Sequence, residues 1–133
     1  MDRLPDAPEG FEPEIGLDDE SIPLWVRIQE SERMMKLAQR AAKGRGITWA
    51  QREAEYYSAK ARESFALLEE GYNATLIAQV IKGMPETNAA LKERLAEKVG
   101  YENAKEAINV YKIITRVLND EQQREWEQAR RTT

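Results

Sequence analysis

The sequence predicts an all-α fold, because its apolar residues recur at helical spacing along most of the chain. The clearest series follows Pro85, where apolar side chains fall mostly three or four positions apart with charged residues between them. This series consists of Leu91, Leu95, Val99, Ala104, Ile108, Tyr111, Ile114, Leu118 and Trp126. Charged residues make up 33% of the chain, as in helices with broad solvated faces. We expect a helical bundle made of an antiparallel hairpin, a short helix and a long C-terminal helix, preceded by an extended arm.

The N-terminal segment differs in composition from the rest of the chain. Residues 1–20 hold eight acidic residues against Arg3 alone, so the remainder carries a net positive charge although the whole carries −4. Four of the five prolines lie in the first 23 residues, which disfavours helix there. We therefore expect residues 1–20 to form an acidic, proline-rich extended arm and residues 21–133 to form one helical bundle domain.

Three large apolar residues, Phe11, Ile15 and Leu17, are spaced along this arm. A disordered tail rarely needs such residues, so two interpretations remain open. Either the arm drapes over the helical body, or it is a partner-binding segment that becomes ordered on contact.

The first helix is expected to follow Ser21, a suitable N-cap, and to continue to about Lys43. Gly44 and Gly46 are expected to end it. Its core-facing residues should be Leu24, Ile28, Met35, Ala38 and Ala42.

The second helix is expected to run from Thr48, which with Gln51 has capping-box spacing, to Glu70. Gly71 should end it in a Schellman motif, with Tyr72 contacting Leu67. The residues expected to face the core are Ala50, Ala54, Tyr57, Ala61, Phe65 and Leu68. The many alanines of this helix, at positions 50, 54, 59, 61 and 66, should let it pack closely against the first in an antiparallel hairpin.

Asn73 should cap a short helix over residues 74–82, and a long helix should follow Pro85 and continue to about Ala129. If continuous, the last helix would span about 66 Å, roughly twice the length of either expected earlier helix. Two outcomes remain open. Gly100 can break this helix and fold it back, or the helix stays continuous and its protruding half pairs with another subunit. We favour the continuous helix and self-association, with a homodimer as the leading expectation.

The expected interface residues are Tyr111, Ile114, Leu118 and Trp126, because this apolar stripe exceeds what the chain itself can cover. Trp126 is the first choice for an interface anchor, since it lies among charged residues near a chain end.

The sequence contains neither cysteine nor histidine, which excludes disulfides, thiolate nucleophiles, Ser-His catalysis and histidine metal sites. The acidic run Asp18, Asp19 and Glu20 could at most bind magnesium. We interpret it as a solvated charge run, because three adjacent residues of an extended arm do not converge on one ion. We expect no catalytic residue, no metal and no cofactor. No apolar run approaches the length of a membrane span, and no signal peptide is recognisable, so a cytoplasmic protein without a membrane partner is expected.

Nucleic acid is the alternative partner to protein. Residues 75–98 can be aligned with a helix-turn-helix whose second helix would present Lys92 and Arg94. A second set of basic residues, Arg40, Lys43 and Arg45, surrounds the expected glycine turn. Acidic residues at 86, 93 and 97 oppose phosphate contact, so a DNA-binding regulator or packaging-type subunit is the second hypothesis.

The run from Glu106 to Lys112, with Gly71 and Gly83 bracketing a short helix upstream, resembles small helical proteins encoded by bacteriophages and prophages. The resemblance covers the last two-thirds of the chain and not the arm. It implies the host cytoplasm and a role such as inhibiting a host defence nuclease or packaging DNA, and it transfers no functional residue. The leading hypothesis is a non-enzymatic interaction module, a phage-type adaptor or inhibitor that occupies the surface of an unidentified protein partner.

Overall fold

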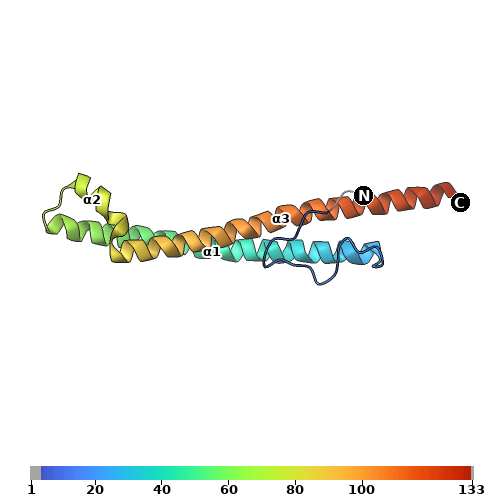
Figure 1. The fold of residues 1–133 in the computed structure, drawn as a ribbon, viewed down its shortest axis with the longest axis horizontal. Helices are drawn as coiled ribbons and strands as arrows, with labels where there is room; N and C mark the ends of the chain where they lie inside the picture. The colour runs from blue at the N-terminus through green and yellow to red at the C-terminus, as the bar shows by residue number, and fades with distance from the viewer. Residues whose placement is uncertain (1–3, 133) are drawn as a thin grey trace. The chain divides into compact units, whose positions relative to one another are not determined.

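The computed structural model describes residues 4–132, and these contain helices and connecting segments but no strand. In chain order the elements are α1 (Leu24–Glu69), α2 (Ala74–Val80), the 3-10 helix η1 (Ile81–Gly83) and α3 (Pro85–Thr132) (Figure 1). The predicted all-α class and the long C-terminal helix are confirmed. Over residues 4–132, none of the helices has an apolar stretch long enough to traverse a bilayer.

The chain divides into two compact units. The terminal unit comprises the described residues of Met1–Ala42 and Glu102–Thr133, and the central unit comprises Lys43–Tyr101. Each unit therefore contains part of α1 and part of α3. The predicted division into an arm and one bundle domain differs from these units, because the arm packs within the terminal unit.

The predicted helix break at Gly44 and Gly46 is wrong, and with it the predicted hairpin between two separate N-terminal helices. α1 passes through both glycines, and the Thr48 hydroxyl donates back to the Gly44 carbonyl 3.2 Å away instead of capping a new helix. A Cβ on Gly46 would lie 3.2 Å from the Tyr101 ring, whereas a Cβ on Gly44 would meet nothing within 4 Å. Gly46 thus permits close packing inside the central unit and does not terminate a helix.

α3 is likewise continuous through Gly100, which confirms the favoured alternative over a bend. A Cβ at Gly100 would lie 3.0 Å from Nη1 of Arg45, so this glycine makes room for a neighbouring side chain.

The helix ends in the central unit follow the predicted signals closely. Gly71 has φ +99, the Gly71 N–H donates to the Leu68 carbonyl at 3.0 Å, and the Tyr72 N–H donates to the Leu67 carbonyl at 3.1 Å. These two bonds form the predicted Schellman ending. Asn73 also caps α2 as predicted, since its Oδ1 accepts from the Leu76 N–H at 2.8 Å.

The predicted core face of α1 is confirmed in the terminal unit and wrong in the central unit. Leu24, Ile28, Ala38 and Ala42 are buried and Met35 is half-buried. All six residues assigned to the core between positions 50 and 68, which are Ala50, Ala54, Tyr57, Ala61, Phe65 and Leu68, are exposed instead.

The opposite face of α1 is buried in the central unit. Its buried residues are Tyr56, Ala59 and Leu67, and Leu67 packs with Ile77 and Ile81. The Arg94 guanidinium carbon lies 4.5 Å from the centre of the Tyr56 ring.

Ion pairs link α1 and α3 on either side of this aromatic contact. They are Arg45–Glu97 at 3.6 Å, Arg52–Glu93 at 3.6 Å, Glu53–Arg94 at 3.9 Å and Arg62–Glu86 at 3.5 Å. Periodicity alone favoured the more apolar face, but the charged face has cross-helix partners and is therefore the one that faces α3.

A carboxylate on α1 caps the start of α3. Glu63 Oε1 accepts from the Thr87 N–H at 2.5 Å and from the Thr87 hydroxyl at 2.6 Å, and Thr87 is fully buried. Burial raises the pKa of Glu63, but the hydrogen bonds from Thr87 and from the Glu86 N–H lower it by more, so the net shift is downward.

Replacing Glu63 with glutamine should lower the free energy of unfolding by about 1 kcal/mol at pH 7, because a charged cap is lost from the α3 N-terminus. Since the pKa of Glu63 in the folded protein lies below the ordinary value of a glutamate, the advantage of the carboxylate is present above that ordinary value and disappears as the pH falls through the folded pKa. Urea unfolding of both proteins from pH 7 to pH 2 measures this. A difference that persists unchanged at pH 2 would contradict it.

Replacing Gly44 with alanine should raise the free energy of unfolding by about 1 kcal/mol, because alanine favours helix and meets open space there. The matched variant Gly46→Ala should gain less, since Tyr101 must shift to admit the methyl group. Thermal unfolding followed by circular dichroism compares the two. A destabilised Gly44→Ala would indicate that the helix does break at this glycine.

Candidate functional site

Three of the four residues expected to form an uncovered stripe on the last helix are core residues of the terminal unit, and the fourth, Trp126, is exposed. Tyr111 is 0% exposed, Ile114 3% and Leu118 1%. They form one hydrophobic cluster with Leu17, Leu24, Ile28, Met34 and Val110. The premise that the chain cannot cover this stripe is therefore wrong for these three residues.

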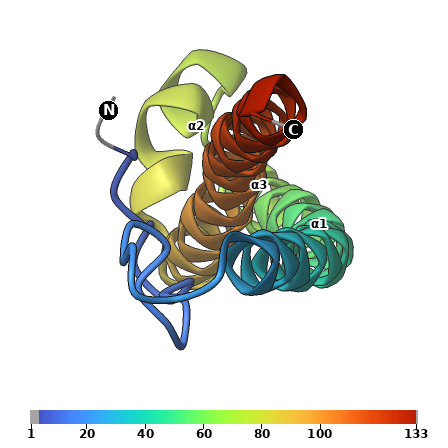
Figure 2. The same cartoon turned by 90° about the vertical axis from the view of Figure 1, so that its right-hand side faces the viewer.

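The arm provides that cover. Leu17 is buried in the cluster, and Phe11 and Ile15 pack against it. In Figures 1 and 2 the arm, drawn in blue, runs beside the first turns of α1 and the second half of α3. The draped arrangement, one of the two alternatives left open, is therefore the one in the structure.

Polar contacts fix the arm along its length. The Tyr111 hydroxyl donates to the Phe11 carbonyl, and Asn103 Nδ2 donates to the Glu9 carbonyl at 3.0 Å. The Glu14 N–H donates to Glu30 Oε2 at 2.7 Å. These bonds satisfy arm backbone groups that would otherwise be desolvated without partners.

Arg27 holds the segment between the arm and α1. Its side chain is 4% exposed, and it donates to the Ile22 carbonyl at 3.0 Å and to the Leu17 carbonyl at 3.3 Å. The guanidinium therefore acts as a structural clamp and is not presented to a ligand.

The acidic run at the end of the arm does not converge. Asp18, Asp19 and Glu20 are exposed, and Asp19 accepts from the N–H and the hydroxyl of Ser21. These hydrogen bonds lower the pKa of Asp19. Among residues 4–132 no group of three or more acidic residues could hold a metal ion.

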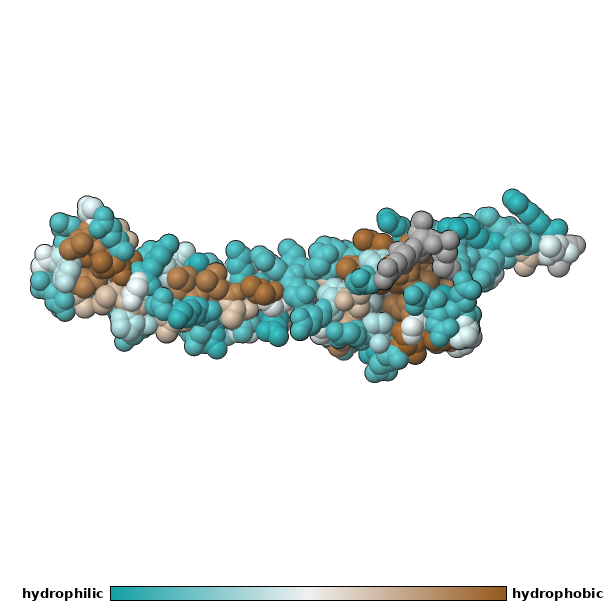
Figure 3. All heavy atoms as spheres, viewed as in Figure 1, coloured by the Kyte–Doolittle hydropathy of each residue, from teal (hydrophilic) through white to brown (hydrophobic). Residues whose placement is uncertain are grey.

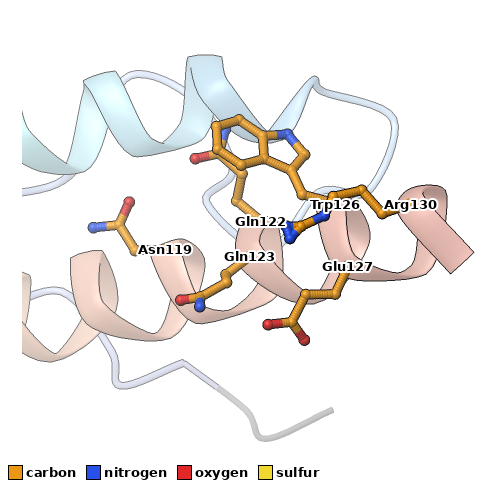
Figure 4. Close-up of a pocket in the computed structure, with 6 residues that line it drawn as sticks. All are labelled: Asn119, Gln122, Gln123, Trp126, Glu127 and Arg130. Carbon is orange, nitrogen blue, oxygen red and sulfur yellow. The ribbon is translucent and has the colours of Figure 1, made fainter.

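Trp126 is exposed, as expected for an indole near the chain end that the rest of the chain does not cover. Its side chain is 66% exposed and borders an open pocket of about 430 Å³ on one side of α3. Figure 4 shows the other lining residues, which are Asn119, Gln122, Gln123, Glu127 and Arg130. This arrangement offers an aromatic surface with amide donors and acceptors. Its predicted use as an interface anchor stays a prediction.

The five basic residues considered for nucleic acid lie on α1 and α3. Arg40, Lys43 and Arg45 lie inside α1, away from any helix end, because the expected turn is absent. Arg45 pairs with Glu97, and Arg94 lies against Tyr56 and Glu53, whereas Lys92 is exposed.

A different surface in the central unit stands out, and we call it the α1 apolar face. It consists of Ile47, Ala50, Ala54, Tyr57, Ala61, Phe65 and Leu68. Its four large residues are more than half exposed, from 54% for Leu68 to 62% for Phe65. The sequence pattern revealed most of these residues, but the pattern alone could not show that they point outward.

Further apolar surface lies on the other helices of the central unit. In Figure 3, apolar side chains gather over α2 and over the first part of α3, where Leu76, Val80, Leu95 and Val99 are exposed. A groove of about 350 Å³ beside α2 is lined by Leu68, Ile77 and Ile81 together with Lys60 and Lys82. The central unit therefore presents several apolar surfaces of the kind that bind protein.

Comparison with known proteins found no matching family model, no matching curated protein and no matching solved structure. The resemblance to small phage-encoded helical proteins accordingly stays a prediction.

Replacing Tyr111 with phenylalanine should leave the helices intact and loosen the arm, because the Phe11 carbonyl loses its hydrogen-bond donor. The expected cost is about 1 kcal/mol, with faster amide exchange over residues 11–17. Burial raises the pKa of Tyr111 to about 12 from 10.0, so the tyrosine stabilises the fold below pH 10 and this contribution declines as the pH rises toward 12.

Hydrogen exchange at pH 7 and unfolding at pH 7 to 12 measure these effects, with Tyr57→Phe as the control on an exposed ring. Equal exchange in Tyr111→Phe and Tyr57→Phe would show that the phenol does not hold the arm.

Proposed function

We propose that this chain is a non-enzymatic helical protein-interaction module that binds its partner through the α1 apolar face. The supporting observation is that Ile47, Tyr57, Phe65 and Leu68 are each at least 54% exposed on one face of a regular helix. Contiguous apolar surface of this kind on a helix is typical of sites that receive another helix.

The energetics favour an occupied face. Fully burying a large apolar side chain contributes about 1.5–3 kcal/mol, so covering the exposed half of four of them can offset part of the entropy lost on association. Ala50, Ala54 and Ala61 add little area themselves but allow a partner backbone to come close.

The terminal unit supports this assignment by contrast. There the arm packs on the buried cluster of α1 and α3, so Tyr111, Ile114 and Leu118 are not accessible to a partner, whereas Trp25 and Ile113 stay exposed. In the central unit α2 and η1 lie beside the α1 apolar face only at its Leu68 end, where they line a shared groove.

The DNA-binding alternative has less support. Groove-binding proteins need several Lys or Arg side chains directed at phosphates. Within residues 75–98 the Arg94 guanidinium is instead directed at Tyr56 and Glu53 of the same unit.

A photo-reactive amino acid tests the proposal in the cell that makes the protein. Placed at Phe65, on the face, it should give specific cross-links to protein. Placed at Ala66, which is exposed but off the face, it should give few. Equal cross-linking from the two adjacent positions would contradict the proposal.

A further inference from the structure

We propose that the occupant of the α1 apolar face is the same face of a second copy of this chain, paired antiparallel. This inference rests on the proposed function and specifies its partner. It differs from the dimer expected from the sequence, which used the last helix.

Six of the seven residues of this face, together with Ser64, have the spacing of a coiled coil, and the seventh, Phe65, falls beside them at an e position. Ile47, Ala54, Ala61 and Leu68 are seven residues apart, and Ala50, Tyr57 and Ser64 fall between them at alternating steps of three and four. These are a and d positions over three heptads, spanning about 32 Å of helix. We call this line of a and d positions the seam. Two charged residues, Glu53 and Lys60, lie beside the seam, both at g positions.

Charge selects the orientation. In a parallel pair, g residues face e residues of the partner, so Glu53 would face Ser58 and Lys60 would face Phe65. In an antiparallel pair, g faces g, so Glu53 and Lys60 can face each other across the seam twice, once on each side of the dyad.

Charge also selects the register. When Ala54 packs opposite Tyr57 of the second copy, Glu53 lies opposite Lys60 of the second copy. A shift of one heptad in one direction brings Lys60 opposite Lys60, and in the other direction brings Glu53 opposite Glu53. Both shifted registers place like charges together, so only one register is attractive.

Side-chain sizes agree with this register. Tyr57 meets Ala54, Ile47 meets Ser64, Ala50 meets Ala61 and Leu68 meets Lys43, so no layer places two large apolar residues together. The two charged side chains make only long contacts within the central unit, which pairing across the seam would replace. Glu53 lies 3.9 Å from Arg94, at the outer limit of an ion pair, and Lys60 Nζ lies 5.9 Å from the Tyr56 ring centre.

Sedimentation equilibrium on the full-length chain tests the proposal through a charge exchange. The wild type should be a dimer at micromolar concentration. Glu53→Lys and Lys60→Glu should each weaken dimerisation about tenfold or more, because two attractive pairs become repulsive. The double variant should recover to within about threefold of wild type.

Mixing the two single variants gives the sharpest outcome. The Glu53→Lys variant carries lysine at both positions 53 and 60, and the Lys60→Glu variant carries glutamate at both. An equimolar mixture should therefore form a heterodimer about as tightly as wild type forms its homodimer. The matched control Glu69→Lys makes the same charge change on an exposed residue outside the seam and should leave dimerisation unchanged.

A monomer at 100 μM, or a dimer that these exchanges do not affect, overturns the antiparallel self-pairing. The cross-linking at Phe65 separates the two proposals. A cross-linked band at the mass of two chains supports self-pairing. A band containing a different protein, with a monomeric pure chain, overturns self-pairing and leaves the interaction function standing.

Discussion

The contact of Tyr56 with Arg94 determines which face of α1 is left for a partner. The Tyr56 ring is 4% exposed and lies under the Arg94 guanidinium, with ion pairs between α1 and α3 before and after it. Because of helical periodicity, the residues of the α1 apolar face, on the side of α1 opposite Tyr56, then point outward. Because those residues are apolar, the central unit has an external face resembling the core-facing stripe of an ordinary helix.

The two units differ in how they cover the apolar side chains that the pairing of α1 with α3 leaves exposed. A pair of long helices cannot bury an apolar stripe on every side, so further chain must cover what remains. In the terminal unit the proline-rich arm does this, held by Tyr111, Glu30 and Arg27. In the central unit α2 and η1 cover only the end near Leu67, through Ile77 and Ile81. Apart from Leu68, which borders a groove beside α2, the α1 apolar face lies beyond that cover.

Local signals in the sequence predicted local structure well. Gly71 with Tyr72 ended α1, Asn73 capped α2, and Pro85 opened α3, because each depends on one residue and its near neighbours. Signals that depend on distant residues were misleading. Gly46 marks a close approach of Tyr101, and Thr48 bonds within the helix, so neither ends α1 as their residue types suggest.

The candidate site illustrates the same limit. Spacing identified Ala50, Ala54, Tyr57, Ala61, Phe65 and Leu68 as one stripe, but which of two faces is inward depends on partners some forty residues away on α3. Likewise Leu118 was expected to lack cover because the arm's course over α1 and α3 cannot be derived from its composition. The sequence thus predicted that the residues of the α1 apolar face lie on one side of a helix, but it did not predict that this side is exposed.

The most direct measurement compares two neighbouring tyrosines. At a protein concentration that keeps the chain monomeric, Tyr56→Ala should lower the free energy of unfolding by about 3 kcal/mol, as expected for a buried aromatic ring. Tyr57→Ala should lower it by less than about 1 kcal/mol, since that ring is 56% exposed. The reverse order would show that the apolar face is the inward one and would contradict the account.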